Sequence, residues 1–331
     1  MERRLSRGGG NNSWKTAFFA SPGPDSGRSA LLVAVKGAFM GAADTVPGVS
    51  GGTIALITGI YEDLLAAIKS LNLRVLGRLI RLDLKAALAE IHVRFLLCLF
   101  CGIGVAVVSL ARLMNHLLNS YPIPTWSLFF GLIAASVWVV GRRVESRASV
   151  SVPAFFIGAA AAYAIVGMVP AQTPETLGFL FLSGMIAVCA MILPGLSGAF
   201  ILLVLGKYEF VVSVLKNPFT PSNLAVLVVF VAGCAVGLVG FSRVLKLLLD
   251  RYHNVALAGL TGLMLGSMRK IWPWKEPLLV ERVHGELMVI KEKNVLPEGI
   301  WPEAVLPILL MAAGFVLVLL LDRLGREKYG G

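Results

Sequence analysis

Long apolar stretches separated by short polar segments constrain the fold of this chain more than any other feature. Several of them exceed the roughly 20 residues that a helix needs to cross a bilayer. Apolar residues make up 57% of the 331 residues and charged residues only 15%, whereas soluble proteins contain about 25% charged residues. We therefore expect an all-α polytopic membrane protein and exclude an ordinary soluble enzyme. The stretches cover residues 30–46, 53–68, 93–118, 125–141, 152–170, 177–193, 199–215, 223–249, 255–268 and 303–321.

The chain also contains an internal repeat. Residues 47–62 read PGVSGGTIALITGIYE, and residues 194–209 read PGLSGAFILLVLGKYE, at an offset of 147. Further matches follow at an offset of 131, and the difference between the two offsets places an insertion in the basic segment 72–90. These matches pair Gly102 with Gly233, Arg112 with Arg243, and Gly131 with Gly262. We therefore divide the membrane domain into a first repeat, residues 30–170, and a second repeat, residues 171–322.

The number of crossings in each repeat decides their relative orientation. Each repeat is expected to begin with a helical hairpin around the Pro-Gly-x-Ser-Gly motif and to continue with three transmembrane helices. A hairpin that re-enters adds no membrane crossing, and one that crosses twice adds two. Each repeat therefore has an odd number of crossings, and the second repeat is inverted relative to the first. Only a single broken helix that continues straight across would reverse this conclusion. The fold class that we predict is two inverted-topology repeats, each with a re-entrant hairpin and three spanning helices.

The distribution of charge supports this topology. Lys and Arg outnumber Asp and Glu by 30 to 19, and most of them lie between the apolar stretches, where they retain a segment in the cytoplasm. This preference of basic residues for the cytoplasmic side, the positive-inside rule, places both termini, the 72–90 insertion and the 142–147 segment inside. The 270–300 loop is an exception, because it is basic and predicted outside, although glutamates offset its charge. Residues 1–29 should form a disordered basic tail and residues 323–331 a short basic one. We expect no nucleic-acid partner.

The Pro-Gly-x-Ser-Gly motif carries the most chemistry. Proline lacks an N–H and glycine permits a tight turn, so each motif should break its segment into two half-helices. The second half-helix would present unpaired N–H groups and a positive dipole end, which suit a phosphate or carboxylate. The alternative is a packing turn, since glycine pairs such as Gly37–Gly41 and Gly233–Gly237 let helices approach closely. Two copies in inverted register favour the ligand site.

Charged residues inside apolar stretches cost at least ~2.5 kcal/mol unless they are paired or solvated. Arg112 and Arg243 are equivalent in the repeat and could transfer an anion between leaflets, or could be arginines that snorkel to the interface. Asp44 lies three residues before the first motif, where a lone acid is a candidate for proton coupling. Glu62 and Glu209 are further coupling candidates, or interfacial anchors together with the preceding tyrosines.

Neither the cysteines nor the histidines show the spacing of a metal site. Cys98 and Cys101 form a CxxC, but two thiols one turn apart without a second ligand pair are more often packing residues. We expect no metal and no cofactor. The many small residues permit a homodimer without requiring one.

With these motifs in place, the sequence resembles the bacterial polyprenyl-phosphate transporter family of the PopT type. The resemblance rests on ADTVPGVSGGTIALITGIYEDLL and LPGLSGAFILLVLGKYEFVV and covers nearly the whole chain after residue 30. It implies a translocase that returns undecaprenyl phosphate, the lipid carrier of cell-wall precursors, from the outer to the inner leaflet of the cytoplasmic membrane. By this resemblance the headgroup would be held by Pro47, Gly48, Ser50, Gly51, Gly52, Thr53, Pro194, Gly195, Ser197 and Gly198, with help from Arg112 and Arg243. The second copy departs from the first at Ala199 and Phe200.

Two other functions remain as alternatives. Membrane undecaprenyl-pyrophosphate phosphatases of the BacA type are similar in their Pro-Gly-x-Ser turns, but there the serine is followed by Arg and Ser. Gly51 and Gly52 stand here instead, which removes the cation expected beside a reacting phosphoryl group. A small-anion secondary transporter is the other alternative. The sequence therefore favours a transporter over an enzyme.

Overall fold

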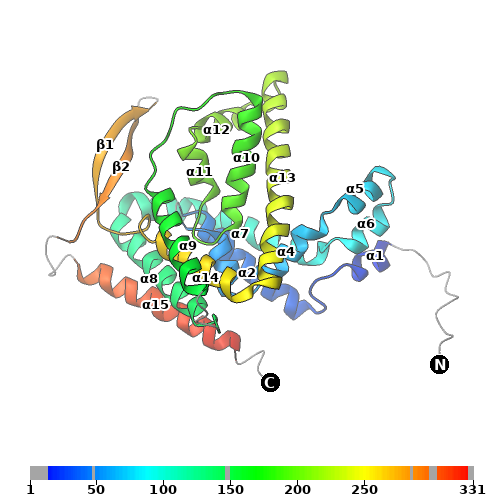
Figure 1. The fold of residues 1–331 in the computed structure, drawn as a ribbon, viewed down its shortest axis with the longest axis horizontal. Coiled ribbons are helices and arrows are strands. Elements are labelled where there is room, and N and C mark those ends of the chain that lie inside the picture. Colours follow the sequence, from blue (N-terminus) through cyan, green and yellow to red (C-terminus); the bar gives the residue numbers. More distant parts are fainter. Residues whose placement is uncertain (1–13, 47–48, 146–149, 284–285, 298–303, 327–331) are drawn as a thin grey trace.

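The computed structural model describes residues 14–46, 49–145, 150–283, 286–297 and 304–326, and it is mostly helical (Figure 1). The first half of the chain forms nine helices within those residues. They are α1 (Trp14–Ala20), α2 (Gly27–Asp44), α3 (Gly51–Ile57), α4 (Tyr61–Ser70), α5 (Leu73–Ile80), α6 (Leu84–Glu90), α7 (Val93–Ser120), α8 (Pro122–Gly141) and α9 (Ser151–Val166).

The second half forms six helices within the described residues and has no counterpart to the α5–α6 insertion. Its helices are α10 (Leu177–Ile192), α11 (Gly198–Val204), α12 (Tyr208–Lys216), α13 (Pro221–Arg251), α14 (His253–Ser267) and α15 (Val305–Arg326). Between α14 and α15, the strands β1 (Lys275–Val283) and β2 (Glu286–Asn294) pair in antiparallel orientation. The 270–300 segment, expected to be a loop, therefore contains a β-hairpin that stands at one end of the molecule (Figure 1).

Three of the described helices are long and apolar enough to cross a membrane, namely α7, α8 and α13. α9, α10 and residues 305–320 of α15 are shorter and apolar. Two further pairs reach the length of a span only together, and both are sharply bent: α3 with α4 by 116° and α11 with α12 by 109°. The chain is a polytopic membrane protein by these criteria.

The bends are a feature that the apolar pattern did not predict. The apolar stretch 53–68 breaks after α3, where Gly59 has a φ of +74°. The second copy breaks at the equivalent Gly206, with a φ of +62°. Left-handed backbone is available to glycine without steric cost, so the same residue type permits the same bend in both halves.

Close glycine contacts show that the repeat extends to packing. A methyl group added to Gly37 of α2 would lie 2.3 Å from the Leu99 carbonyl oxygen of α7, and one added to Gly184 of α10 would lie 2.6 Å from that of Phe230 of α13. These two contacts are related by the offsets of the sequence repeat. The α2–α7 pair and the α10–α13 pair therefore pack through equivalent glycines.

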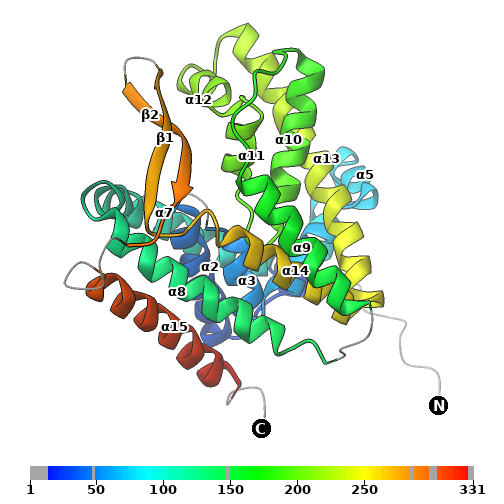
Figure 2. The ribbon, with the colours of Figure 1, turned by 60° about the vertical axis from the view of Figure 1, so that its left-hand side comes forward.

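The last two helices of each half pack across the halves. α8 lies along α15, and α9 lies along α14 (Figure 2). A methyl group on Gly131 of α8 would lie 2.0 Å from the Met311 carbonyl oxygen, and one on Gly262 of α14 would lie 2.0 Å from that of Phe155. Since Gly131 and Gly262 are repeat mates, the two cross-half contacts are also equivalent, and the halves share their helix packing.

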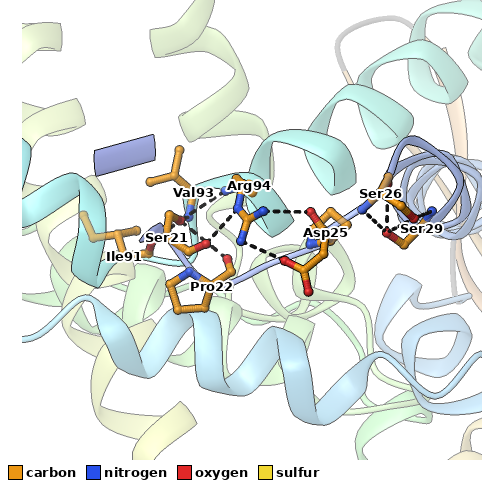
Figure 3. Close-up of polar contacts among 9 residues, drawn as sticks. Ser21, Pro22, Asp25, Ser26, Ser29, Ile91, Val93 and Arg94 are labelled. Carbon is orange, nitrogen blue, oxygen red and sulfur yellow. Dashed lines mark hydrogen bonds and ion pairs between the residues drawn. The ribbon is translucent and has the colours of Figure 1, made fainter. Parts of the chain in front are cut away.

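The N-terminal segment differs from the disordered tail expected over residues 1–29. Residues 1–13 lie outside the described residues, but α1 and the turn after it are ordered against α7 (Figure 3). The buried Ser21 hydroxyl accepts a hydrogen bond from the Val93 N–H (2.9 Å) and donates one to the Ile91 carbonyl (2.6 Å). The Arg94 guanidinium donates to the Ser21 carbonyl (2.8 Å) and pairs with Asp25 (3.2 Å).

This arrangement has a simple cause. His92, the residue before α7, provides no side-chain cap, and the first N–H groups of a helix have no partner within it. Ser21 provides the missing acceptor from a distant part of the chain.

The basic 72–90 insertion and the C-terminal tail are also partly helical. The insertion forms α5 and α6, which Arg78 and Glu90 join by an ion pair. The basic tail was expected from residue 323, but α15 continues to Arg326. Residues 327–331 lie outside the described residues.

Candidate functional site: two contacting turns

The first turn joins α2 to α3 and is closed by a carboxylate. Asp44, the last residue of α2, accepts a hydrogen bond from the Gly51 N–H at 2.7 Å. A methyl group on Gly51 would lie 2.6 Å from the second oxygen of Asp44, so a larger residue there would displace the carboxylate. Pro47 and Gly48, both predicted to belong to the site, lie outside the described residues.

Ser50 caps α3 at this turn. Its hydroxyl accepts a hydrogen bond from the Gly52 N–H at 3.2 Å, and the Thr53 N–H bonds to the Ser50 carbonyl at 3.0 Å. Together with the bond from Gly51 to Asp44, these contacts engage the first N–H groups of α3. The sequence predicted that they would be unpaired, and that expectation is wrong in this conformation because a nearby acid and the capping serine satisfy them.

The second turn joins α10 to α11 in a similar way. Ser197 caps α11 and accepts from the Phe200 N–H at 3.4 Å. Gly195 has a φ of +87°, and a methyl group there would lie 2.7 Å from the hydroxyl oxygen of Ser267 in α14. Met191 stands at the position equivalent to Asp44. Pro194, Gly195 and Gly198 are buried.

The two turns contact each other directly. The Gly195 N–H donates to the Thr53 hydroxyl at 2.9 Å, and the Ser50 hydroxyl donates to the Leu193 carbonyl at 3.4 Å. The Tyr61 hydroxyl donates to the Ile192 carbonyl at 3.0 Å. Thr53 and Ser50 are both buried. Predicted site residues more than 140 positions apart thus meet at one polar junction between the halves.

The structure does not bring the two predicted arginines to this junction. Arg112 and Arg243 are exposed on α7 and α13. Neither guanidinium has a hydrogen-bond or ion-pair partner among the residues that the structure describes. Both side chains point away from the helix packing, which agrees with either of the roles considered for them.

The acidic candidates occupy different environments. Glu62 pairs with Lys246 of α13 at 3.0 Å, and Lys246 also pairs with Asp250 at 2.8 Å. Glu62 therefore ties α4 to α13. Glu209 is exposed at the start of α12. Asp44, in contrast, contacts the first turn directly.

Sequence reasoning did not single out a second group of charges, near the β-hairpin. Arg269, Lys270, Lys275 and Glu292 lie together where α14 ends and the hairpin begins. The available signal was the basic character of the 270–300 segment, which conflicted with its predicted outer location. No group of three or more His, Cys, Asp or Glu within the described ranges is placed to hold a metal ion.

Apolar helices, two sharply bent helical pairs and a polar junction between repeated turns are features of membrane transporters built from internal repeats. Comparisons with known proteins agree. Residues 40–288 match the VCA0040-like family, described as undecaprenyl phosphate translocase-like. The chain belongs to this family.

Two relatives extend the comparison. A polyprenyl-phosphate transporter of Vibrio cholerae serotype O1 is 44% identical over 90% of this chain and 96% of its own length. A polyprenyl-phosphate transporter of Staphylococcus aureus is 31% identical over 72% of this chain and 85% of its own length. No solved structure shows a significant match. Both relatives are named as polyprenyl-phosphate transporters, which agrees with the family resemblance stated from the sequence.

Proposed function

We propose that this protein returns undecaprenyl phosphate from the outer to the inner leaflet of the bacterial cytoplasmic membrane, where the lipid is reused as a carrier of cell-wall precursors. Family membership supports the substrate class. The observation that carries the proposal is the direct hydrogen bond between the two turns, Thr53 to Gly195, because it joins equivalent elements of the two repeats at one polar point. Residues 30–170 and 171–322 act in this proposal as inverted repeats, with both termini in the cytoplasm.

The phosphate headgroup would pass between the two turns while the polyprenyl chain stays in the lipid. Hydroxyl groups of Ser50, Thr53 and Ser197, together with the backbone N–H groups of the glycines, provide its hydrogen bonds. In the present conformation several of these groups bond to each other. Transport therefore requires the turns to separate, which exchanges the contacts between the turns for contacts with the phosphate oxygens.

Asp44 suits the coupling of this exchange to protons. Its carboxylate occupies the Gly51 N–H, and a phosphate would compete for the same donor. Protonation of Asp44 weakens its hold on that N–H, because a charged acceptor makes a stronger hydrogen bond than a neutral one. A proton on Asp44 and a phosphate at Gly51 therefore favour each other. Glu62, which is held by Lys246, suits an anchoring role, and we assign Glu209 by symmetry to the same role.

A cellular measurement tests the proposal. Cells that lack this protein and any redundant carrier are probed with an antibiotic that binds undecaprenyl phosphate on the outer face. The lipid should accumulate there, and wild-type protein should reverse the accumulation while the Ser50→Ala variant should not. A rise of undecaprenyl pyrophosphate instead would indicate the phosphatase, and no change in either lipid would indicate a soluble anion as the substrate.

The role of Asp44 is tested separately in vesicles with an imposed pH gradient. Asp44→Asn should retain some lipid movement but lose its dependence on the gradient, because the amide cannot exchange a proton. Glu62→Gln is the matched control and should keep the dependence. A gradient response that persists in Asp44→Asn would remove Asp44 from the coupling step.

A further inference from the structure

Four cations surround two neighbouring cavities beneath the β-hairpin. One cavity has a volume of about 500 Å³ and is lined by Arg269 and Lys293, and the other, of about 100 Å³, is lined by Arg269, Lys270 and Lys275. Among the described residues that line either cavity, Glu292 is the one with a carboxylate. The lining of the two cavities therefore has an excess of positive charge.

Aromatic rings hold two of the cations in place without neutralising them. The Arg269 guanidinium lies 4.3 Å from the centre of the Tyr163 ring and donates to the Tyr163 carbonyl at 3.1 Å. The Lys275 ammonium lies 4.9 Å from the centre of the Trp126 ring. Aromatic faces attract cations, but they carry no net charge. These contacts fix the positions of the positive groups and leave their charge available to an anion.

Glu292 balances only part of this charge. The same oxygen of Glu292 lies 3.1 Å from the Lys275 ammonium and 3.6 Å from the Lys270 ammonium. The Lys275 side chain is only 12% exposed. A buried cation is costly unless an anion accompanies it, so one carboxylate shared by two lysines leaves room for a second anion.

The cluster adjoins the turns at which the headgroup is proposed to cross. Lys270 lies 5.3 Å from the centre of the Phe200 ring, and Phe200 belongs to the first turn of α11. Ser267, three residues before Lys270, abuts Gly195. Ile271 packs in one apolar cluster with Val46 and Val49 of the first turn. An anion held by the cluster would therefore lie beside the entrance to the junction.

We propose that Arg269, Lys270 and Lys275 form a capture site for the phosphate monoester headgroup of the polyprenyl lipid before it reaches the turns. This inference rests on the proposed function, which places the β-hairpin on the outer face, where the lipid is collected. It also explains why a predicted outer segment is basic. The apolar residues Val166, Met168 and Val169, which line the smaller cavity, provide a surface along which the first isoprene units can lie.

The full chain in detergent, titrated with farnesyl phosphate, tests this site by calorimetry. Lys270→Gln and Arg269→Gln should each weaken binding by about tenfold or more, since each removes a hydrogen bond from a charged group to the phosphate. Glu292→Gln should strengthen binding, because it removes the competing anion. Lys216→Gln, an equal change of charge at the exposed end of α12, should have no effect.

The opposite changes in affinity expected for Lys270→Gln and Glu292→Gln distinguish a capture site from a cluster with a structural role. If the cluster only stabilised the hairpin, Glu292→Gln and Lys270→Gln would both disrupt the same ion pairs, and neither would strengthen binding. Titrations with inorganic phosphate and with phosphatidylglycerol identify the source of the anion. Binding of inorganic phosphate as tight as that of farnesyl phosphate would overturn the lipid assignment, and so would equal competition by phosphatidylglycerol.

The binding experiment can contradict the capture site without contradicting the proposed function. If wild-type protein binds farnesyl phosphate and neither Lys270→Gln nor Arg269→Gln weakens the binding, the capture site is wrong and the translocase proposal stands. If the wild-type protein binds no farnesyl phosphate and cells that lack it accumulate no lipid, both proposals are wrong.

Discussion

The backbone N–H of Gly195 donates a hydrogen bond to the hydroxyl of Thr53, 2.9 Å away, and so joins the second turn to the first. Thr53 is fully buried, and Gly195 is held in a left-handed conformation that glycine adopts readily. Since each residue belongs to a different copy of the repeat, this bond is one of the contacts that join the two halves of the chain in the candidate site.

Replacement of Thr53 by valine tests this bond. Valine has the same shape but no acceptor, so the Gly195 N–H would be left buried without a partner at a cost of about 1–3 kcal/mol. We expect lower thermal stability and slower lipid transport. Thr261→Val is the control, because the buried Thr261 hydroxyl bonds, among the described residues, only to Leu257 of its own helix. Equal transport defects in both variants would deny Thr53 a special role.

Equivalent glycines should respond equally to substitution. Gly131→Ala and Gly262→Ala each place a methyl group 2.0 Å from a facing carbonyl oxygen, and such overpacking costs about 1–3 kcal/mol or more. Gly104→Ala and Gly240→Ala, where the added methyl meets nothing within 4 Å, are the controls and should not destabilise. Thermal unfolding in detergent measures all four. A large difference between Gly131→Ala and Gly262→Ala would contradict the equivalence of the halves.

Capture of the headgroup should weaken at alkaline pH. Burial lowers the pKa of Lys275, although Glu292 opposes the shift, and Lys270 adds to it. Only the protonated amine attracts phosphate, so affinity should fall as pH rises and should begin to fall below the pH at which an ordinary lysine loses its proton. Above pH ~7.5 the phosphate is already dianionic and does not contribute to the trend.

Lys275→Arg is the matched variant for this titration, since arginine stays charged throughout. Its affinity for farnesyl phosphate should fall less steeply than that of the wild-type protein, because one of the two lysines of the capture site has been replaced by a residue that stays charged. Parallel curves for the two proteins would show that another group causes the decline.

The N-terminal contact should affect stability rather than transport. Ser21→Ala removes the hydroxyl that serves the start of α7, and loss of a helix cap costs about 0.5–2 kcal/mol. We expect a lower unfolding temperature and unchanged lipid movement per folded molecule. Ser109→Ala, where an exposed hydroxyl bonds within its own helix, should leave the unfolding temperature unchanged. A transport defect at full stability in Ser21→Ala would give the segment a functional role.

Local patterns in the sequence predicted the spanning helices, the repeat and the break in the helix at both turns. Those features depend on residues close together in the chain, such as the Pro-Gly-x-Ser-Gly motif. The junction between Thr53 and Gly195 was only partly predictable: symmetry suggested that the turns are related, but it did not show that they bond. The position of Ser21 against α7 could not be predicted, because this contact joins residues about 70 positions apart.

The bend at Gly59 and the cations beside the β-hairpin illustrate two other reasons for failure. Gly59 lies inside an apolar stretch, and apolar character alone does not distinguish a straight helix from a bent pair. Lys270 and Lys275 were interpreted only as topological charges. Their role in a site depends on Trp126 and Phe200, which contact them from distant helices.

The most direct test of the central claim is lipid movement in vesicles that contain only the purified protein. Undecaprenyl phosphate is placed in one leaflet, and its appearance in the other is followed with a probe that cannot cross the membrane. Wild-type protein should transfer the lipid faster than protein-free vesicles do, Thr53→Val should transfer it more slowly, and no inorganic phosphate should be released. Lipid that stays in its original leaflet, or that loses its phosphate, would contradict the translocase account.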